Sequence, residues 1–127
     1  MTQEEKQLLL KDLCARLPYG VKCKMWSGEA IEHSITETLR ISGLDAFMCN
    51  DSFSIKPYLR PMFSITEEEK IELKTITKGV IQTIGLEDIV VTTDEGFDYL
   101  NAHHLDYRGL IPMGLALEAP EDMYKEE

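Results

Sequence analysis

Hydrophobic residues near the start of the chain recur at the three- and four-residue spacing of a helix. These residues are Leu8, Leu9, Leu13, Cys14 and Leu17. Thr2 followed by Glu5 is the pattern of a capping box, in which each side chain bonds the backbone of the other residue at a helix start. Pro18 cannot continue a helix and marks its end. We therefore predict an amphipathic helix over residues 3–17.

The hydrophobic period shortens to two between residues 20 and 57, which is typical of half-buried strands. Apolar and polar residues alternate from Val21 to Trp26, and turn-forming pairs such as Ser27-Gly28 separate the strand-like runs. A short apolar run follows at residues 46–49. The pattern predicts an antiparallel meander of about four strands. Curled on itself it would resemble a small SH3-like partial barrel, with one face packed on helices.

A second capping-box pattern, Thr66 with Glu69, precedes apolar residues at helical spacing. It predicts a helix over residues 66–84. The β-branched run at residues 89–93 fits either a strand or the approach to the next helix.

Thr92 with Glu95 is a third capping-box pattern and predicts a helix over residues 93–104. The charged end of the chain, residues 118–127, is expected to be a frayed tail. Together these elements predict one α+β domain over residues 1–127. Its N-terminal helix leads into the meander, and two C-terminal helices pack on it.

Charge is unevenly placed along the 127 residues. Residues 1–63 hold 8 acidic and 8 basic residues, whereas residues 64–127 hold 15 acidic and 5 basic ones, so the net charge of −10 lies in the second half. Nucleic acid is thus an improbable partner for that half. A small basic face stays open in the first half, from Lys22, Lys24, Arg40, Lys56 and Arg60. The acidity either keeps the protein soluble or forms a surface that meets a basic partner or mimics nucleic acid.

The three cysteines, an odd number at unrelated spacings, favour reduced thiols over a disulfide framework. The acidic start is unlike a signal peptide and no apolar run is long enough to span a membrane, so we expect a cytoplasmic protein. Nucleotide-binding, hydrolase and metal-binding motifs are missing from the sequence. We therefore predict no cofactor and no metal site, and we favour a protein that is not an enzyme.

One cluster is rich in catalytic residue types: His103 and His104, followed by Asp106. Adjacent helical residues point about 100° apart, which argues against a joint metal site. One packed and one exposed histidine is the simpler interpretation. The alternative is a general base oriented by Asp106, in a small hydrolase or metal-dependent enzyme.

Other candidates are weighed between binding and structural roles. Trp26 beside Lys24 is either an aromatic-basic patch or the cover of a core edge. Tyr58 and Arg60 stand between two prolines, in either a recognition segment or a buried connector. Arg108 either anchors an anionic ligand or makes internal ion pairs.

Three blocks of sequence resemble a known family: KDLCARLPYGVKC, IKPYLRPM with TEEEK, and YLNAHHLDYRGLIPMGLALEAPEDMY. The family is a small uncharacterised one from gut Bacteroides-type bacteria, often encoded in phage or other mobile-element regions. The resemblance implies an intracellular setting and an accessory role in a mobile element. It implies no activity and no catalytic residue.

The leading hypothesis is a non-enzymatic accessory protein that binds a macromolecular partner, for which we expect a protein. The predicted contacts are Trp26, Tyr58 and Arg60 on one side, or Tyr99, His103, Tyr107 and Arg108 on the other. The alternatives are the enzyme centred on His103, His104 and Asp106, and an acidic inhibitor that mimics nucleic acid.

Overall fold

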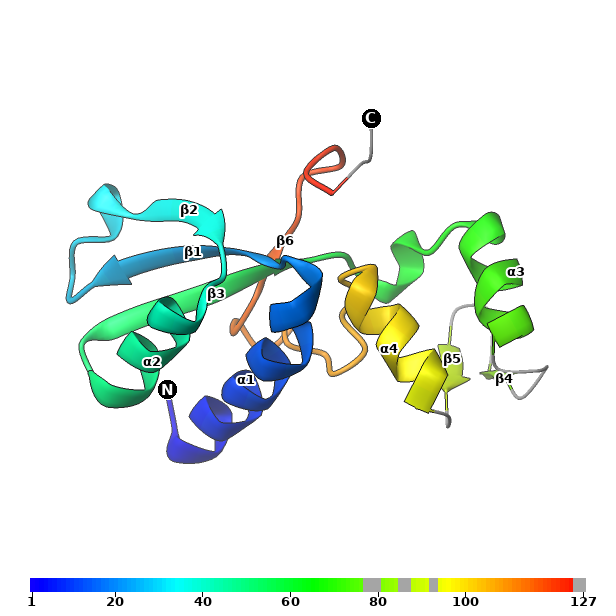
Figure 1. Cartoon of the computed structure of the whole chain (residues 1–127), viewed down its shortest axis with the longest axis horizontal. Helices are drawn as coiled ribbons and strands as arrows, with labels where there is room; N and C mark the ends of the chain where they lie inside the picture. The colour runs from blue at the N-terminus through cyan, green and yellow to red at the C-terminus, as the bar shows by residue number, and fades with distance from the viewer. Residues whose placement is uncertain (77–80, 85–87, 92–93, 125–127) are drawn as a thin grey trace.

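The protein has an α+β fold, as the sequence predicts (Figure 1). The computed structural model describes residues 1–76, 81–84, 88–91 and 94–124. Its α-helices are α1 (Gln3–Arg16), α2 (Ile41–Cys49), α3 (Glu67–Ile76) and α4 (Asp94–Ala102). Its strands are β1 (Lys22–Ser27), β2 (Ile35–Thr38), β3 (Phe53–Leu59), β4 (Ile81–Ile84), β5 (Asp88–Val91) and β6 (Leu117–Glu118). No helix in these ranges is long and apolar enough to cross a membrane.

The main sheet has four strands in the order β2-β1-β3-β6. β1 runs antiparallel to both neighbours, whereas β6 runs parallel to β3. Strands β2 and β6 form the two edges, and no pairing joins them among the described strands, so this sheet is open. β4 and β5 make a separate antiparallel pair. Figure 1 shows this pair with α3 and α4 beyond one end of the main sheet.

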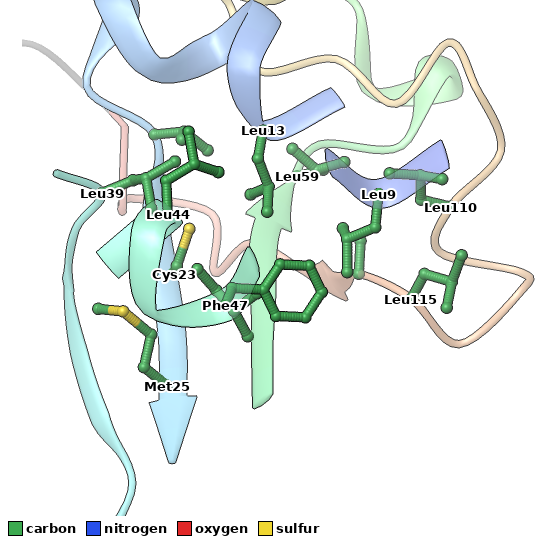
Figure 2. Close-up of a cluster of buried hydrophobic side chains, with 13 residues drawn as sticks. Leu9, Leu13, Cys23, Met25, Leu39, Leu44, Phe47, Leu59, Leu110 and Leu115 are labelled. Atoms are coloured by element: carbon green, nitrogen blue, oxygen red, sulfur yellow. The ribbon is translucent and has the colours of Figure 1, made fainter. Parts of the chain in front are cut away.

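Helices α1 and α2 cover one face of the main sheet, because alternate residues of β1 and β3 are buried beneath them. Figure 2 shows this core, in which Leu9 and Leu13 of α1 and Phe47 of α2 meet Cys23 of β1 and Leu59 of β3. The side chains of the intervening residues of β1 and β3 lie on the opposite face of the sheet. A second, smaller core joins α3 and α4 through Leu73, Tyr99, Leu100, Leu105 and Ile65.

Two predicted helices are confirmed, with shorter ends. α1 begins with the capping box, since Thr2 and Glu5 each accept a hydrogen bond from the other's backbone N–H. It ends at Arg16, and residues Leu17–Tyr19 form a 3₁₀ turn. α4 occupies Asp94–Ala102 of the predicted 93–104.

The predicted meander over residues 20–57 is wrong in its middle. The apolar run at residues 46–49 belongs to α2, not to a strand. Leu44 and Phe47, three residues apart, are buried on one side of α2, whereas Met48 and Cys49 are exposed, so the burial follows the spacing of a helix and not the alternation of a strand. The strand before this run, β2, begins only at Ile35, because Ile31–His33 is a 3₁₀ turn.

The predicted helix over residues 66–84 is too long. α3 ends at Ile76, and residues 81–84 form β4, which pairs with β5. The spacing of apolar residues at 81–84 also fits a helix, but these residues pair with β5, whose β-branched sequence favours a strand. Residues 77–80 lie outside the described ranges. The run at 89–93 is a strand as far as Val91, and residues 92–93 are not described.

The predicted frayed tail over residues 118–127 is wrong for its described part. The backbone N–H of Ala119 donates to Leu59 at 2.8 Å, continuing the pairing of β6. The Tyr124 hydroxyl donates to the Tyr58 carbonyl at 2.7 Å and accepts from the Lys22 N–H at 2.9 Å. The tail therefore docks on the backbone of β1 and β3, through its own backbone at Ala119 and through the Tyr124 hydroxyl. The sequence pattern does not predict these contacts. Residues 125–127 lie outside the described ranges.

Asp12 lies between two arginines inside the protein. Asp12 and Arg16 are both fully buried, and Arg16 Nε lies 2.9 Å from Asp12 Oδ2. Arg16 Nη2 also donates to the Leu105 carbonyl at 2.6 Å. Arg108 Nε lies 3.1 Å from the other carboxylate oxygen. The Asp12 carboxylate therefore pairs with Arg16 of its own helix and with Arg108 from a distant segment. Because Arg16 also bonds Leu105 of the second core, this network connects the two cores.

We predict that Asp12→Ala destabilises the protein by about 3–5 kcal/mol, because it leaves Arg16 as a buried charge without a counter-ion. The free energy of unfolding is measured in urea by circular dichroism.

The matched control is Asp51→Ala, which removes the carboxylate of the exposed Lys6–Asp51 pair and is expected to change stability little. A cost of Asp12→Ala below about 1 kcal/mol, the net value of an ordinary hydrogen bond, would contradict the role assigned to Asp12.

Candidate binding surfaces

The two adjacent histidines have different environments. His103 is partly exposed, its ring stacks on Tyr99 at 4.1 Å, and its Nδ1 lies 3.2 Å from Glu69 Oε2. His104 is buried with a positive φ of 58°, and its ring stacks on Tyr124 at 3.9 Å. Burial and the nearby Arg16 charge lower the pKa of His104 to about 4. His104 is therefore neutral at physiological pH and serves as a packed aromatic ring.

Asp106 bonds the chain that follows it. Its two carboxylate oxygens accept from the backbone N–H groups of Leu110 at 2.8 Å and Ile111 at 2.9 Å. These bonds hold the turn after the second core, so the carboxylate orients neither histidine. In the part of the chain that the structure describes, no group of three or more His, Cys, Asp or Glu residues is arranged to hold a metal ion.

Tyr99, Tyr107 and Arg108 make internal contacts. The Tyr99 hydroxyl donates to Glu72 at 2.8 Å, and burial together with this carboxylate raises the pKa of Tyr99. The Tyr107 hydroxyl donates to Asn101, and Arg108 Nη2 donates to the same hydroxyl, both at 2.9 Å. These contacts account for the placement of all three side chains. Their predicted role in partner binding stays a prediction.

Arg60 and Glu69 form a two-pronged ion pair next to a cavity. Arg60 Nη1 and Nη2 each lie 2.7 Å from a Glu69 oxygen, and Nη2 also donates to the Ser64 carbonyl. Glu69 further accepts from the Thr66 N–H in a capping box at the start of α3. Hydrogen bonds from Arg60 lower the pKa of Glu69 to about 2. The charge of Arg60 is therefore satisfied within the protein.

Two adjacent cavities, which share Pro61 and Glu118 in their walls, form what we call the Pro61 groove. The larger has a volume of about 560 Å³ and the smaller about 340 Å³. One wall comes from the chain between β3 and α3, and the other from the turn after Asp106 and from the docked tail. Its lining includes Arg60, Pro61, Phe63, Glu118, Glu121 and Tyr124.

The groove combines apolar surface with unpaired carboxylates. Phe63 is 68% exposed at one end, and prolines contribute to both cavities. Among the described residues, neither Glu118 nor Glu121 has an ion-pair partner. Because Arg60 is neutralised by Glu69, the groove presents uncompensated negative charge beside aromatic and proline rings.

The sheet face that α1 and α2 leave uncovered has the opposite character. We call it the open sheet face and define it by Lys22, Lys24 and Trp26 of β1 and Ser54, Lys56 and Tyr58 of β3. The register pairs Lys24 directly with Lys56 and Trp26 with Ser54, so these side chains share one face. Sequence reasoning identified Trp26, Tyr58 and the lysines, and the sheet brings them together. Arg60 does not join this face, because its side chain bonds Glu69.

Sequence reasoning missed the Pro61 groove. Glu118 and Glu121 stand in a charged tail that resembles a disordered end, and only the parallel pairing of β6 with β3 places them near Pro61. A strand of two residues is too short to be predicted from a local sequence pattern. The signal available in the sequence was a phenylalanine two residues after Pro61; the exposure of Phe63 is seen only in the structure.

Comparison with known proteins adds no relative: no family model, no curated protein and no solved structure matches this chain.

We predict that Glu69→Gln destabilises the protein by about 2 kcal/mol at pH 7, because two bonds to a charged partner are weakened. The pKa of Glu69 is lowered in the folded state, so its stabilisation is complete above pH 4.5 and is lost as the pH falls toward 2. The difference between wild type and variant, measured by urea unfolding at a series of pH values, should therefore shrink over that interval.

Glu67→Gln on the same helix end is the control, since Glu67 is 86% exposed and forms an exposed ion pair with Lys70. A difference for Glu69→Gln that stays constant from pH 7 to pH 2 would disprove the proposed origin of the stabilisation.

Proposed function

We propose that this protein is a non-enzymatic accessory protein that binds a basic segment of a protein partner in the Pro61 groove. The observation that carries the proposal is the pair of unpaired carboxylates, Glu118 and Glu121, beside exposed apolar surface in one concave site. A site of this kind suits lysine and arginine side chains, which offer an apolar stem and a charged end.

The charge of the whole protein supports a basic partner. Residues 64–127 carry the net charge of −10, and this half supplies most of the groove. A surface with one sign of charge raises the local concentration of ligands of the other sign and speeds their encounter. Nucleic acid would be repelled from the same surface.

The size of the groove supports a short peptide rather than a large flat interface. Ligand cavities typically have volumes of about 300–1,000 Å³, and both cavities fall in that range. The larger cavity accommodates a long basic side chain against Tyr124 and the prolines, and the smaller one an apolar side chain against Phe63. An alternation of basic and apolar residues in the partner fits both.

The proposed cellular setting rests on the resemblance to a protein family that is often encoded in phage or other mobile-element regions. We propose a cytoplasmic protein that assists another protein of such an element or of its host. The histidine pair does not favour catalysis, because His104 is packed against Tyr124 and Asp106 holds a turn.

We predict that the double variant Glu118→Gln/Glu121→Gln binds a fluorescein-labelled peptide of alternating arginine and leucine at least fivefold more weakly than wild type does. The reason is the loss of the two groove carboxylates, and the dissociation constant is measured by fluorescence anisotropy.

Glu29→Gln/Glu32→Gln is the matched control, because it removes the same net charge from exposed positions between β1 and β2. Equal weakening in both double variants would mean that only net charge matters, and the groove would lose its assigned role. Absence of binding to wild type would refute the proposal directly.

A further inference from the structure

We propose that the open sheet face binds a short segment of single-stranded nucleic acid, at a site separate from the Pro61 groove. The proposal rests on three features of the face within the described part of the chain: two opposed lysines without counter-ions, a tryptophan that belongs to neither core, and the absence of a covering helix.

Lys24 and Lys56 form a like-charge pair across the β1–β3 ladder. Directly opposite like charges destabilise a sheet. Among the described residues, no carboxylate forms an ion pair with either ammonium group. The adjoining position on β2 is Thr36, which is neutral. An anion that lies on the face would relieve this repulsion.

Trp26 is the only tryptophan of the chain, and it is only partly buried. It is absent from both hydrophobic cores, and within the described chain its ring stacks on no other aromatic residue and receives no cation. A large aromatic ring beside lysines, with one side open, provides a surface on which a nucleic-acid base stacks.

The spacing of the aromatic residues suits several nucleotides. Trp26 pairs with Ser54, and Tyr58 lies four residues farther along β3, with Lys24 and Lys56 between them. Four residues of strand span about 14 Å. This length matches about four nucleotides at the stacked spacing of about 3.4 Å. Bases can stack on the two ends while the lysines contact the intervening phosphates.

The small size of the basic surface limits the ligand to a short one. Lys22 Nζ already donates to the Met123 carbonyl at 3.3 Å, which leaves Lys24 and Lys56 for phosphates. The acidic second half repels any chain that extends far beyond the sheet. An acidic peptide would also neutralise the lysines, but it would leave Trp26 without a stacking partner, so we favour the nucleic acid.

The test uses the fluorescence of the single tryptophan. Wild-type protein is titrated with an oligonucleotide of eight thymidines, and in parallel with a peptide of eight glutamates. We expect saturable quenching by the oligonucleotide only. Since two phosphates are neutralised, the logarithm of the binding constant should fall with the logarithm of salt concentration with a slope of about −1.4.

The double variant Lys24→Gln/Lys56→Gln should bind the oligonucleotide at least tenfold more weakly, while its melting temperature equals or exceeds that of wild type because the like-charge pair is gone. Lys11→Gln/Arg40→Gln, which removes the same charge from exposed positions outside the face, should bind within twofold of wild type. A labelled oligonucleotide should also bind Trp26→Ala more weakly in an anisotropy assay.

Three results would overturn the proposal. Quenching by the glutamate peptide but not by the oligonucleotide would assign the face to an acidic protein. Quenching by neither, or equal loss in the two double variants, would leave the lysines and Trp26 without a ligand of this class.

Discussion

The buried carboxylate of Asp12 is the constraint on which the arrangement of the fold depends. It must satisfy Arg16 from its own helix and Arg108 from a segment 96 residues away. Replacing such a group by apolar residues often costs nothing, whereas removing one partner is costly. The network therefore contributes a unique arrangement more than net stability. The bond from Arg16 to the Leu105 carbonyl holds α1 in place against the second core.

The same contacts help to position the chain that forms the Pro61 groove. The chain from Leu105 to Ile111 is fixed by Arg16 at its start and by the Asp106 carboxylate in the turn that follows. It then leads to β6, whose pairing with β3 carries the tail across the end of the sheet. Tyr124 lines the Pro61 groove and at the same time bonds the backbone of β1 and β3. The acidic groove and the basic sheet face thus meet at one residue.

The sequence could predict what local chemistry determines. The capping box of Thr2 and Glu5 placed α1, and strict alternation placed β1, so Trp26 and Lys24 were assigned to one face correctly. α2 was missed because Arg40 at its start provides no side-chain cap and its apolar run also fits a strand. Arg60 was grouped with Trp26 and Tyr58 because it lies with Tyr58 between Pro57 and Pro61. Its partner Glu69 could not be inferred, because the ion pair depends on how α3 folds back.

The docked tail explains why the groove required the structure. β6 has two residues, and a parallel pair this short is not stable by itself. It persists because Tyr124 supplies a hydroxyl to two strands and a ring to His104. Burial keeps His104 neutral, so its ring packs against Tyr124 without placing an unpaired charge inside the protein. A peptide bound in the groove as proposed would contact the tail and the chain before α3 together, so its binding energy would also stabilise the docked tail. The proposal therefore links partner binding thermodynamically to the closing of the fold at its C-terminal end.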